Sequence, residues 1–415
     1  MSNEQIKEKK RILDALKKGN IPNADVTPLC VGMDKELKLF DEILESVSED
    51  DEAITKFIQG EFGTGKSFLL KVLEEKAFKE NFVVSKITLS NDIRMNKIEV
   101  FYKAIAKNLK CKTGIGLKKI IERWYNKLNN RANLSEDISI KERNKIIEES
   151  VRDDLEDCRQ YANAFANATE GYIKSLRQED YDTADDAIAW LSGDFNVPFN
   201  RKRKFGVKGD VEKENALNYL KGLSAFIKSI GYSGLVILVD EAEYTLNINN
   251  RTYRDVAYNY IRDIYDGCSD GEYDSTLFIF AATLDFYEDS RKGVRSYSAL
   301  YNRIQPNFED MDDIRRPIIQ LKGFNHQDLI KIGDNIIKMH EEVYKWNSKS
   351  LINLEAVLDS EEEEATLTNG LVVPRSYLRL LVDYLDVVQQ NPDKADLALD
   401  KIKKEEFYDE DIEDW

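Results

Sequence analysis

Residues 60–67 read Gly-Glu-Phe-Gly-Thr-Gly-Lys-Ser, a complete phosphate-binding loop of the form G-x-x-x-x-G-K-[ST]. Residues 54–59 before the loop are β-prone, and residues 68–77 after it carry apolar side chains at helical spacing. The motif therefore has the strand–loop–helix context that its chemistry requires. In such a loop the backbone N–H groups and the helix N-terminus face a phosphate chain. The loop predicts a nucleotide-binding α/β protein that uses ATP and Mg²⁺.

The loop residues have individual expected roles. We expect Lys66 to reach the β- and γ-phosphates and the Ser67 hydroxyl to ligate Mg²⁺. The residues expected to contact the nucleotide are Gly60, Glu61, Phe62, Gly63, Thr64, Gly65, Lys66, Ser67 and Phe68.

A second motif follows an unbroken apolar run at residues 235–239, which is typical of a strand buried on both faces. Asp240 ends this run, where its carboxylate is expected at the carboxyl edge of the sheet as a ligand of Mg²⁺. Glu241 follows directly and is expected to orient and polarise the attacking water. The two motifs together predict the Walker A and Walker B elements of a P-loop ATPase.

Three further residues are candidates for the catalytic site. Thr283 ends the apolar run 277–282 and can bond the attacking water or the γ-phosphate, with Asp285 as its competitor. Arg303 precedes the last predicted strand and can act as an arginine finger toward an adjacent subunit, or form a surface ion pair. Arg375 lies at a helix start after Pro374 and can sense the γ-phosphate, or join lid and core as an ordinary ion pair.

Strands alternate with helices along the chain, which predicts a parallel α/β sheet followed by a helical domain. We expect an N-terminal helical segment at 1–30, a P-loop ATPase core at 31–322, and a helical lid domain with an acidic tail at 323–415. Residues of about 97–192 read as almost wholly helical. Because Lys66 and Asp240 are far apart in the sequence, the block of about 97–210 is expected to form an insertion.

The charge distribution limits the partners. The 415 residues have a net charge of −17, which argues against a generally basic nucleic-acid binder. One basic run, from Arg201 to Lys208, is either a solvated loop or a weak contact to DNA or to an acidic partner. The chain has only two histidines, His326 and His340, which we expect to be polar surface residues, so histidine-based catalysis is disfavoured.

No apolar stretch approaches the roughly 20 residues of a membrane helix, and the N-terminus lacks a signal-peptide core. The four cysteines have no C-x-x-C spacing and predict neither zinc nor disulfides. We therefore expect a cytoplasmic protein with no membrane contact.

The order of these parts resembles AAA+ ATPases near the origin-recognition-like branch. A tighter resemblance, to the BREX-system ATP-binding family, covers nearly the whole chain. It rests on the segments 11–23, 31–32, 60–70, 82–90, 190–193, 231–243 and 374–375 with the leucines that follow. The resemblance implies an ATPase of bacterial anti-phage or anti-plasmid defence, commonly encoded beside a helicase. Ser67 stands where many relatives have Thr, which keeps the hydroxyl.

The leading hypothesis is an AAA+-like, Mg²⁺-dependent ATPase that acts as a switch or loader in a defence complex. It would work with a helicase or another DNA-acting partner, in a homo- or hetero-oligomer. One alternative is a regulatory module that binds ATP with negligible turnover. A free-standing helicase is disfavoured because no second strand series follows, and a small-molecule kinase because no substrate pocket is legible.

Overall fold

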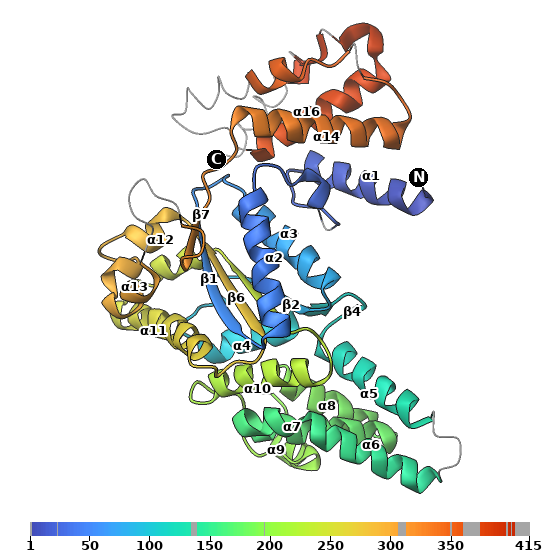
Figure 1. The fold of residues 1–415 in the computed structure, drawn as a ribbon, viewed down its shortest axis with the longest axis vertical. Coiled ribbons are helices and arrows are strands. Elements are labelled where there is room, and N and C mark those ends of the chain that lie inside the picture. Colours follow the sequence, from blue (N-terminus) through green and yellow to red (C-terminus); the bar gives the residue numbers. More distant parts are fainter. Residues whose placement is uncertain are drawn as a thin grey trace. The chain divides into compact units, whose positions relative to one another are not determined.

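The computed structural model describes residues 2–22, 24–133, 139–194, 196–305, 313–348, 351–359, 374–395, 397–399 and 401–402. The chain divides into two compact units (Figure 1). The sheet unit contains Lys38–Gln59 and Lys76–Gln320, and the helical unit contains Met1–Leu37, Gly60–Glu75 and Leu321–Trp415. The predicted acidic tail, residues 405–415, lies outside the described residues.

The sheet unit is built on a seven-stranded sheet with the order β4-β3-β2-β5-β6-β1-β7. Five strands, β2, β5, β6, β1 and β7, pair in parallel, and β3 and β4 add an antiparallel hairpin at one edge. The strands are β1 (Ala53–Gln59), β2 (Val83–Thr88), β3 (Leu109–Cys111), β4 (Gly114–Ile115), β5 (Leu235–Asp240), β6 (Thr276–Ala282) and β7 (Ile318–Gln320). The predicted α/β class with a mostly parallel sheet is confirmed.

The two central strands, β5 and β6, have the apolar sequence of strands that are covered on both faces. Every residue of β5 and β6 is buried, as expected for strands covered by helices on both faces. Because parallel strands end at the same edge, the residues that follow β5, β6 and β1 leave the sheet on one side. Strand β6 lies between β5 and β1.

Helices of the sheet unit surround this sheet and extend beyond it (Figure 1). They are α4 (Ile98–Lys107), α5 (Leu117–Asn133), α6 (Ile140–Asp154), α7 (Glu156–Arg177), α8 (Tyr181–Leu191), α9 (Phe199–Lys202), α10 (Ala216–Ser229), α11 (Arg251–Ser269), α12 (Leu284–Glu288) and α13 (Ser298–Ile304), with the 3₁₀ turns η2 (Arg203–Phe205), η3 (Ala242–Asn247) and η4 (Val294–Ser296). Helices α2 (Asp34–Glu49) and α3 (Lys66–Lys79) have residues in both units.

The helices expected to form an insertion share one continuous hydrophobic core with the sheet. Helix α7 packs against α10 and α8. The Trp124 ring meets Phe226 edge-on at 5.5 Å, and the Tyr102 hydroxyl donates to the Leu191 carbonyl at 2.9 Å. The helical block is therefore part of the sheet unit's interior and not a separately folded appendage.

The expectation that residues 97–192 are almost wholly helical is wrong at one place. After α4 the chain forms the β3–β4 hairpin, and β3 pairs with β2 to extend the sheet. Gly116 has φ +92°, a left-handed conformation that favours glycine, and its N–H donates to the Leu109 carbonyl at 2.7 Å. Strands of two or three residues give no alternating pattern long enough to distinguish them from helix.

The helical unit buries the N-terminal helix against the C-terminal helices. Its elements are α1 (Asn3–Lys17), η1 (Thr27–Leu29), α14 (His326–Tyr344), α16 (Pro374–Gln390) and η5 (Pro392–Lys394). Ser2 caps α1 in a capping box with Gln5, and the buried Ile12, Leu13 and Leu16 join the core of α14 and α16. These contacts tie the segment predicted as residues 1–30 to the predicted lid.

His340 corrects the expectation of a surface histidine, because its side chain is fully buried. The Trp346 indole donates to Nδ1 at 2.9 Å, so Nε2 carries the proton and donates to Asp386 at 3.2 Å. Burial alone would raise the pKa of Asp386, but the bonds from His340 and Lys17 outweigh it and lower that pKa. The other histidine, His326, is exposed as expected.

Candidate nucleotide-binding site

The glycine loop, residues 60–65, joins the carboxyl end of β1 to the first turn of α3. Gly63 has φ +82° and Gly65 has φ +92°, conformations that a residue with a Cβ adopts only with strain. At Gly65 a Cβ would also lie 2.9 Å from Met33 Cε and 3.0 Å from a ring carbon of Phe324. Backbone conformation and close packing therefore both require glycine at this position.

Lys66 opens α3 and is buried within its own loop. Its ammonium group donates to the carbonyls of Gly60 at 2.7 Å and Glu61 at 2.9 Å, and lies 5.4 Å from the centre of the Phe62 ring. If a phosphate bound Lys66, the lysine would exchange these two loop carbonyls for phosphate oxygens. The lysine is thus positioned at the loop before any ligand contributes a contact.

The remaining loop residues differ in what their side chains do. The Thr64 hydroxyl donates to the Glu61 carbonyl at 2.8 Å and so closes the loop. Phe62 is 79% exposed, whereas Phe68 packs on the core of the helical unit. Ser67 is half-buried in the first turn of α3. The Phe68 side chain therefore supports the loop from the protein side, although its backbone N–H lies near the start of α3.

Asp240 is the last residue of β5, and its side chain is only 8% exposed. One oxygen, Oδ1, accepts the Glu241 backbone N–H at 3.1 Å. The other, Oδ2, lies 3.9 Å from the ammonium nitrogen of Lys86 on β2. This carboxylate has the hard oxygen donors that Mg²⁺ requires, so its chemistry fits the predicted metal ligand.

Glu241 has φ 56° and ψ 43°, in the left-handed region. The side chain is exposed at the sheet edge. A non-glycine residue in this region is strained, and strained residues of this kind are frequent at functional sites. The conformation turns the chain sharply from β5 into η3.

Thr283 follows β6 and caps α12 by position, with its side chain buried. The parallel register pairs Gln59 with Ala282 and Val239 with Phe280. Thr283 therefore leaves the same sheet edge as Asp240 and as the end of β1, the strand that leads into the glycine loop. Its competitor Asp285 is exposed in α12.

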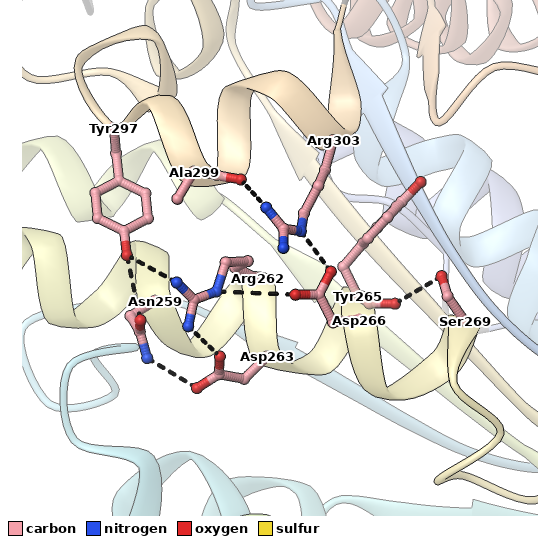
Figure 2. A network of polar contacts seen from close by, with 9 residues as sticks. All are labelled: Asn259, Arg262, Asp263, Tyr265, Asp266, Ser269, Tyr297, Ala299 and Arg303. Carbon is pink, nitrogen blue, oxygen red and sulfur yellow. Dashed lines mark hydrogen bonds and ion pairs between the residues drawn. The ribbon is translucent and has the colours of Figure 1, made fainter.

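Arg303 lies in a polar network between α13 and α11, which Figure 2 shows. Its Nε donates to Asp266, and its Nη1 donates to the Ala299 carbonyl at 2.6 Å. Asp266 also lies 3.9 Å from Arg262, which pairs with Asp263 at 2.7 Å. Arg303 is 38% exposed and is engaged within its own chain.

Arg375 is exposed in the first turn of α16. Its aliphatic stem lies beside the turn that follows α1, because a Cβ at Gly19 would be 3.3 Å from Arg375 Cγ. Gly19 has φ +64°, so this turn depends on glycine in two ways. The contact places Arg375 at the junction of α1 and α16.

The basic run at 201–208 is partly used in folding. Lys202 is buried and donates to both oxygens of Asp210 at 2.8 Å, and Arg201 pairs with Asp186 at 2.9 Å. The cations that remain exposed are Arg203, Lys204 and Lys208, and Arg203 lies 5.9 Å from the centre of the Phe199 ring. The run is therefore a weaker electrostatic patch than its sequence indicates.

Sequence reasoning missed three residues close to these groups. Met33 and Phe324 pack on Gly65, and Lys86 faces Asp240. Only Lys86 could have been noticed in the sequence, because a charged residue in the middle of an apolar strand is unusual. Met33 and Phe324 look like ordinary apolar residues in the sequence.

The described ranges of the chain also bear on metal binding and on membrane contact. No group of three or more His, Cys, Asp or Glu side chains there could hold a metal ion. None of the helices in those ranges has the length and apolarity needed to cross a membrane. The four cysteines all lie within the described part of the chain, and none of them forms a disulfide there.

Comparison with known proteins gives one informative result. The curated proteins contain no match to this chain. A family model described as BREX system ATP-binding protein BrxC/D matches residues 5–401. The match covers nearly the whole sequence and agrees with the glycine loop and the parallel sheet, and the chain therefore belongs to the BREX system ATP-binding protein BrxC/D family.

Proposed function

We propose that this protein is a Mg²⁺-dependent ATPase that acts as a switch or loader in BREX defence against phage. The observation that carries the proposal is a complete phosphate-binding loop at the end of β1, in a parallel sheet whose next strand but one ends in Asp240-Glu241. Membership of an ATP-binding family supports it independently.

The loop residues would bind the triphosphate through backbone N–H groups, and Lys66 would exchange its loop carbonyls for phosphate oxygens. Asp240 and the Ser67 hydroxyl would hold Mg²⁺, which polarises the phosphoryl group as a Lewis acid. Glu241 would orient the attacking water, and Thr283 would bond that water or the γ-phosphate. The strained backbone of Glu241 supports a catalytic role.

Two arginines would make turnover depend on assembly and on the helical unit. We propose that Arg303 exchanges Asp266 for the nucleotide of an adjacent subunit, and that Arg375 senses the γ-phosphate. Release of the phosphate would then change the surface offered to a helicase or another DNA-acting partner. DNA contact by this chain itself would be weak and salt-sensitive, through the exposed cations of the 201–208 run.

Binding and turnover measured on matched variants test the proposal. Lys66→Ala should abolish binding of a fluorescent ATP analogue. Glu241→Gln, which keeps the side chain's shape, should bind ATP normally but lose multiple-turnover phosphate release. Thr64→Ser serves as a control that keeps the loop-closing hydroxyl.

The assays should be run with the protein alone, with added DNA, and with a candidate partner protein such as a helicase. Wild-type binding without turnover in every condition would favour the regulatory module that only signals ATP occupancy. An unchanged turnover rate for Glu241→Gln would remove Glu241 from the catalytic role.

A further inference from the structure

Lys86 occupies a position in the sheet where a lysine is unexpected. Strand β2 lies between β3 and β5, and four of its six residues are buried. Such internal strands are normally apolar on both faces, because a charge there loses water. The Lys86 side chain is 22% exposed. Its charge therefore needs a partner at the edge of the sheet.

The register identifies that partner. Lys86 pairs with Leu238 and Thr88 pairs with Asp240 across the parallel β2–β5 ladder. Residues two apart on a strand share a face, so the long Lys86 side chain can extend along the sheet toward the Asp240 position. Its ammonium nitrogen lies 3.9 Å from Asp240 Oδ2.

The two oxygens of Asp240 are therefore oriented by different groups. Oδ1 accepts the Glu241 N–H, and Oδ2 faces Lys86. Because the carboxylate is almost completely buried, water screens this attraction less than at an exposed pair. A divalent cation bound by Asp240 would be drawn to the same negative oxygen and repelled by the lysine.

We propose that Lys86 is a positioning residue that orients the Asp240 carboxylate and competes with Mg²⁺ for its Oδ2 oxygen. Lys86 thereby sets the Mg²⁺ concentration at which the nucleotide site becomes competent. This inference rests on the proposed function, because it assigns a regulator to the metal ligand of that same site.

The test is the Mg²⁺ dependence of nucleotide binding, measured by the fluorescence of an ATP analogue without any need for turnover. Lys86→Met keeps the length of the side chain and removes the charge. The Mg²⁺ concentration for half-maximal binding should fall by about two- to fivefold, the range of a partly exposed ion pair. Lys86→Arg, which keeps the charge, should behave like the wild type.

Lys56→Met provides a matched control. Lys56 is also a lysine of an internal strand, but it donates to the Arg315 and Arg316 carbonyls and not to Asp240. This variant should leave the Mg²⁺ dependence unchanged. Circular dichroism spectra of all three variants establish that they are folded.

Three outcomes separate the possibilities. A lower half-maximal Mg²⁺ concentration in Lys86→Met alone supports the inference. An unchanged or higher value in a folded Lys86→Met protein overturns it, and a higher value would mean that Lys86 contacts the phosphates instead. Wild-type protein that binds no nucleotide at any Mg²⁺ concentration would overturn the proposed function itself.

Discussion

Glu241 has the carboxylate that we expect to be catalytic, and its backbone is in the left-handed conformation that few non-glycine residues adopt. Its φ of 56° costs about 1 kcal/mol relative to an ordinary conformation. Asp240 immediately before it completes a fully buried strand, so the turn must begin at Glu241. The sheet edge thus places a strained residue where the proposed chemistry would need an acid.

We predict that Glu241→Gly is more stable than Glu241→Ala by about 1 kcal/mol, because glycine accepts a positive φ without strain. Both variants lack the carboxylate and should lose turnover equally. Urea unfolding followed by circular dichroism measures the difference in stability. A glycine variant less stable than the alanine variant would show that the turn is not strained.

A second prediction at this scale separates the two roles of Arg303, which pairs with Asp266 in its own chain. Because the pair is partly exposed, breaking it from either side should cost about 1 kcal/mol or less. A finger role predicts that Arg303→Ala lowers turnover by about 10³-fold with ATP affinity unchanged. Asp266→Asn, the matched partner variant, should keep turnover. Equal turnover in the two variants would leave Arg303 as an ion pair only.

At the scale of elements, β1 is the strand that leads to the glycine loop, and it also contains a buried cation. Lys56 donates to the carbonyls of Arg315 at 2.7 Å and Arg316 at 2.9 Å. Burial lowers the pKa of Lys56 from 10.5 to about 8. These bonds link β1 to the segment that enters β7.

The depressed pKa predicts a pH dependence of stability. Between pH 8 and 10.5 the unfolded chain holds a proton on Lys56 that the folded chain has released, so this group's contribution to stability rises with pH. Lys56 favours the folded chain most above pH 10.5, where it is neutral in both states, and this advantage is lost as the pH falls through 8 and the buried group becomes charged. The unfolding free energy of Lys56→Met minus that of the wild type should therefore be larger at pH 7.5 than at pH 10, by on the order of 2 kcal/mol.

Urea unfolding of the two proteins at both pH values measures this difference. Other titrating groups cancel in the comparison because both proteins contain them. A difference in unfolding free energy that does not change with pH would contradict the assigned burial of the ammonium group.

At the scale of the whole molecule, the compact units do not follow the linear order of the chain. The glycine loop belongs with the N-terminal segment and with α14 and α16, and β1 and β5 belong to the other unit. Met33 and Phe324, from opposite ends of the sequence, both pack on Gly65. In the proposed function, a nucleotide held by the loop would be coupled to these segments through the contacts of Gly65.

We predict that Mg²⁺–ATP slows amide hydrogen exchange in residues 60–69 and in the segments around Met33 and Phe324. Helices α5 to α8 should exchange unchanged in the isolated protein, because their core is formed with the sheet. Hydrogen-exchange mass spectrometry measures both regions, with Lys66→Ala as the control that shows no protection. Protection confined to α5–α8 would contradict this assignment.

Local patterns made the fold class predictable, and they also carry the proposed site residues. The glycine loop is recognisable because its glycines, lysine and serine act within eight consecutive residues. The β5 and β6 strands are recognisable because strands buried on both faces are continuously apolar. The start of α16 follows from the proline signal at Pro374.

The glycine-loop motif, the acidic pair after β5 and the α/β class can therefore be read from the chain itself, since each depends on neighbours along it. In contrast, three relations become visible only in the folded chain: β6 lies between β1 and β5, Lys86 faces Asp240, and His340 is buried on Asp386. Those relations join residues that are tens to hundreds of positions apart. They arise from strand pairing and core packing, which no local pattern encodes.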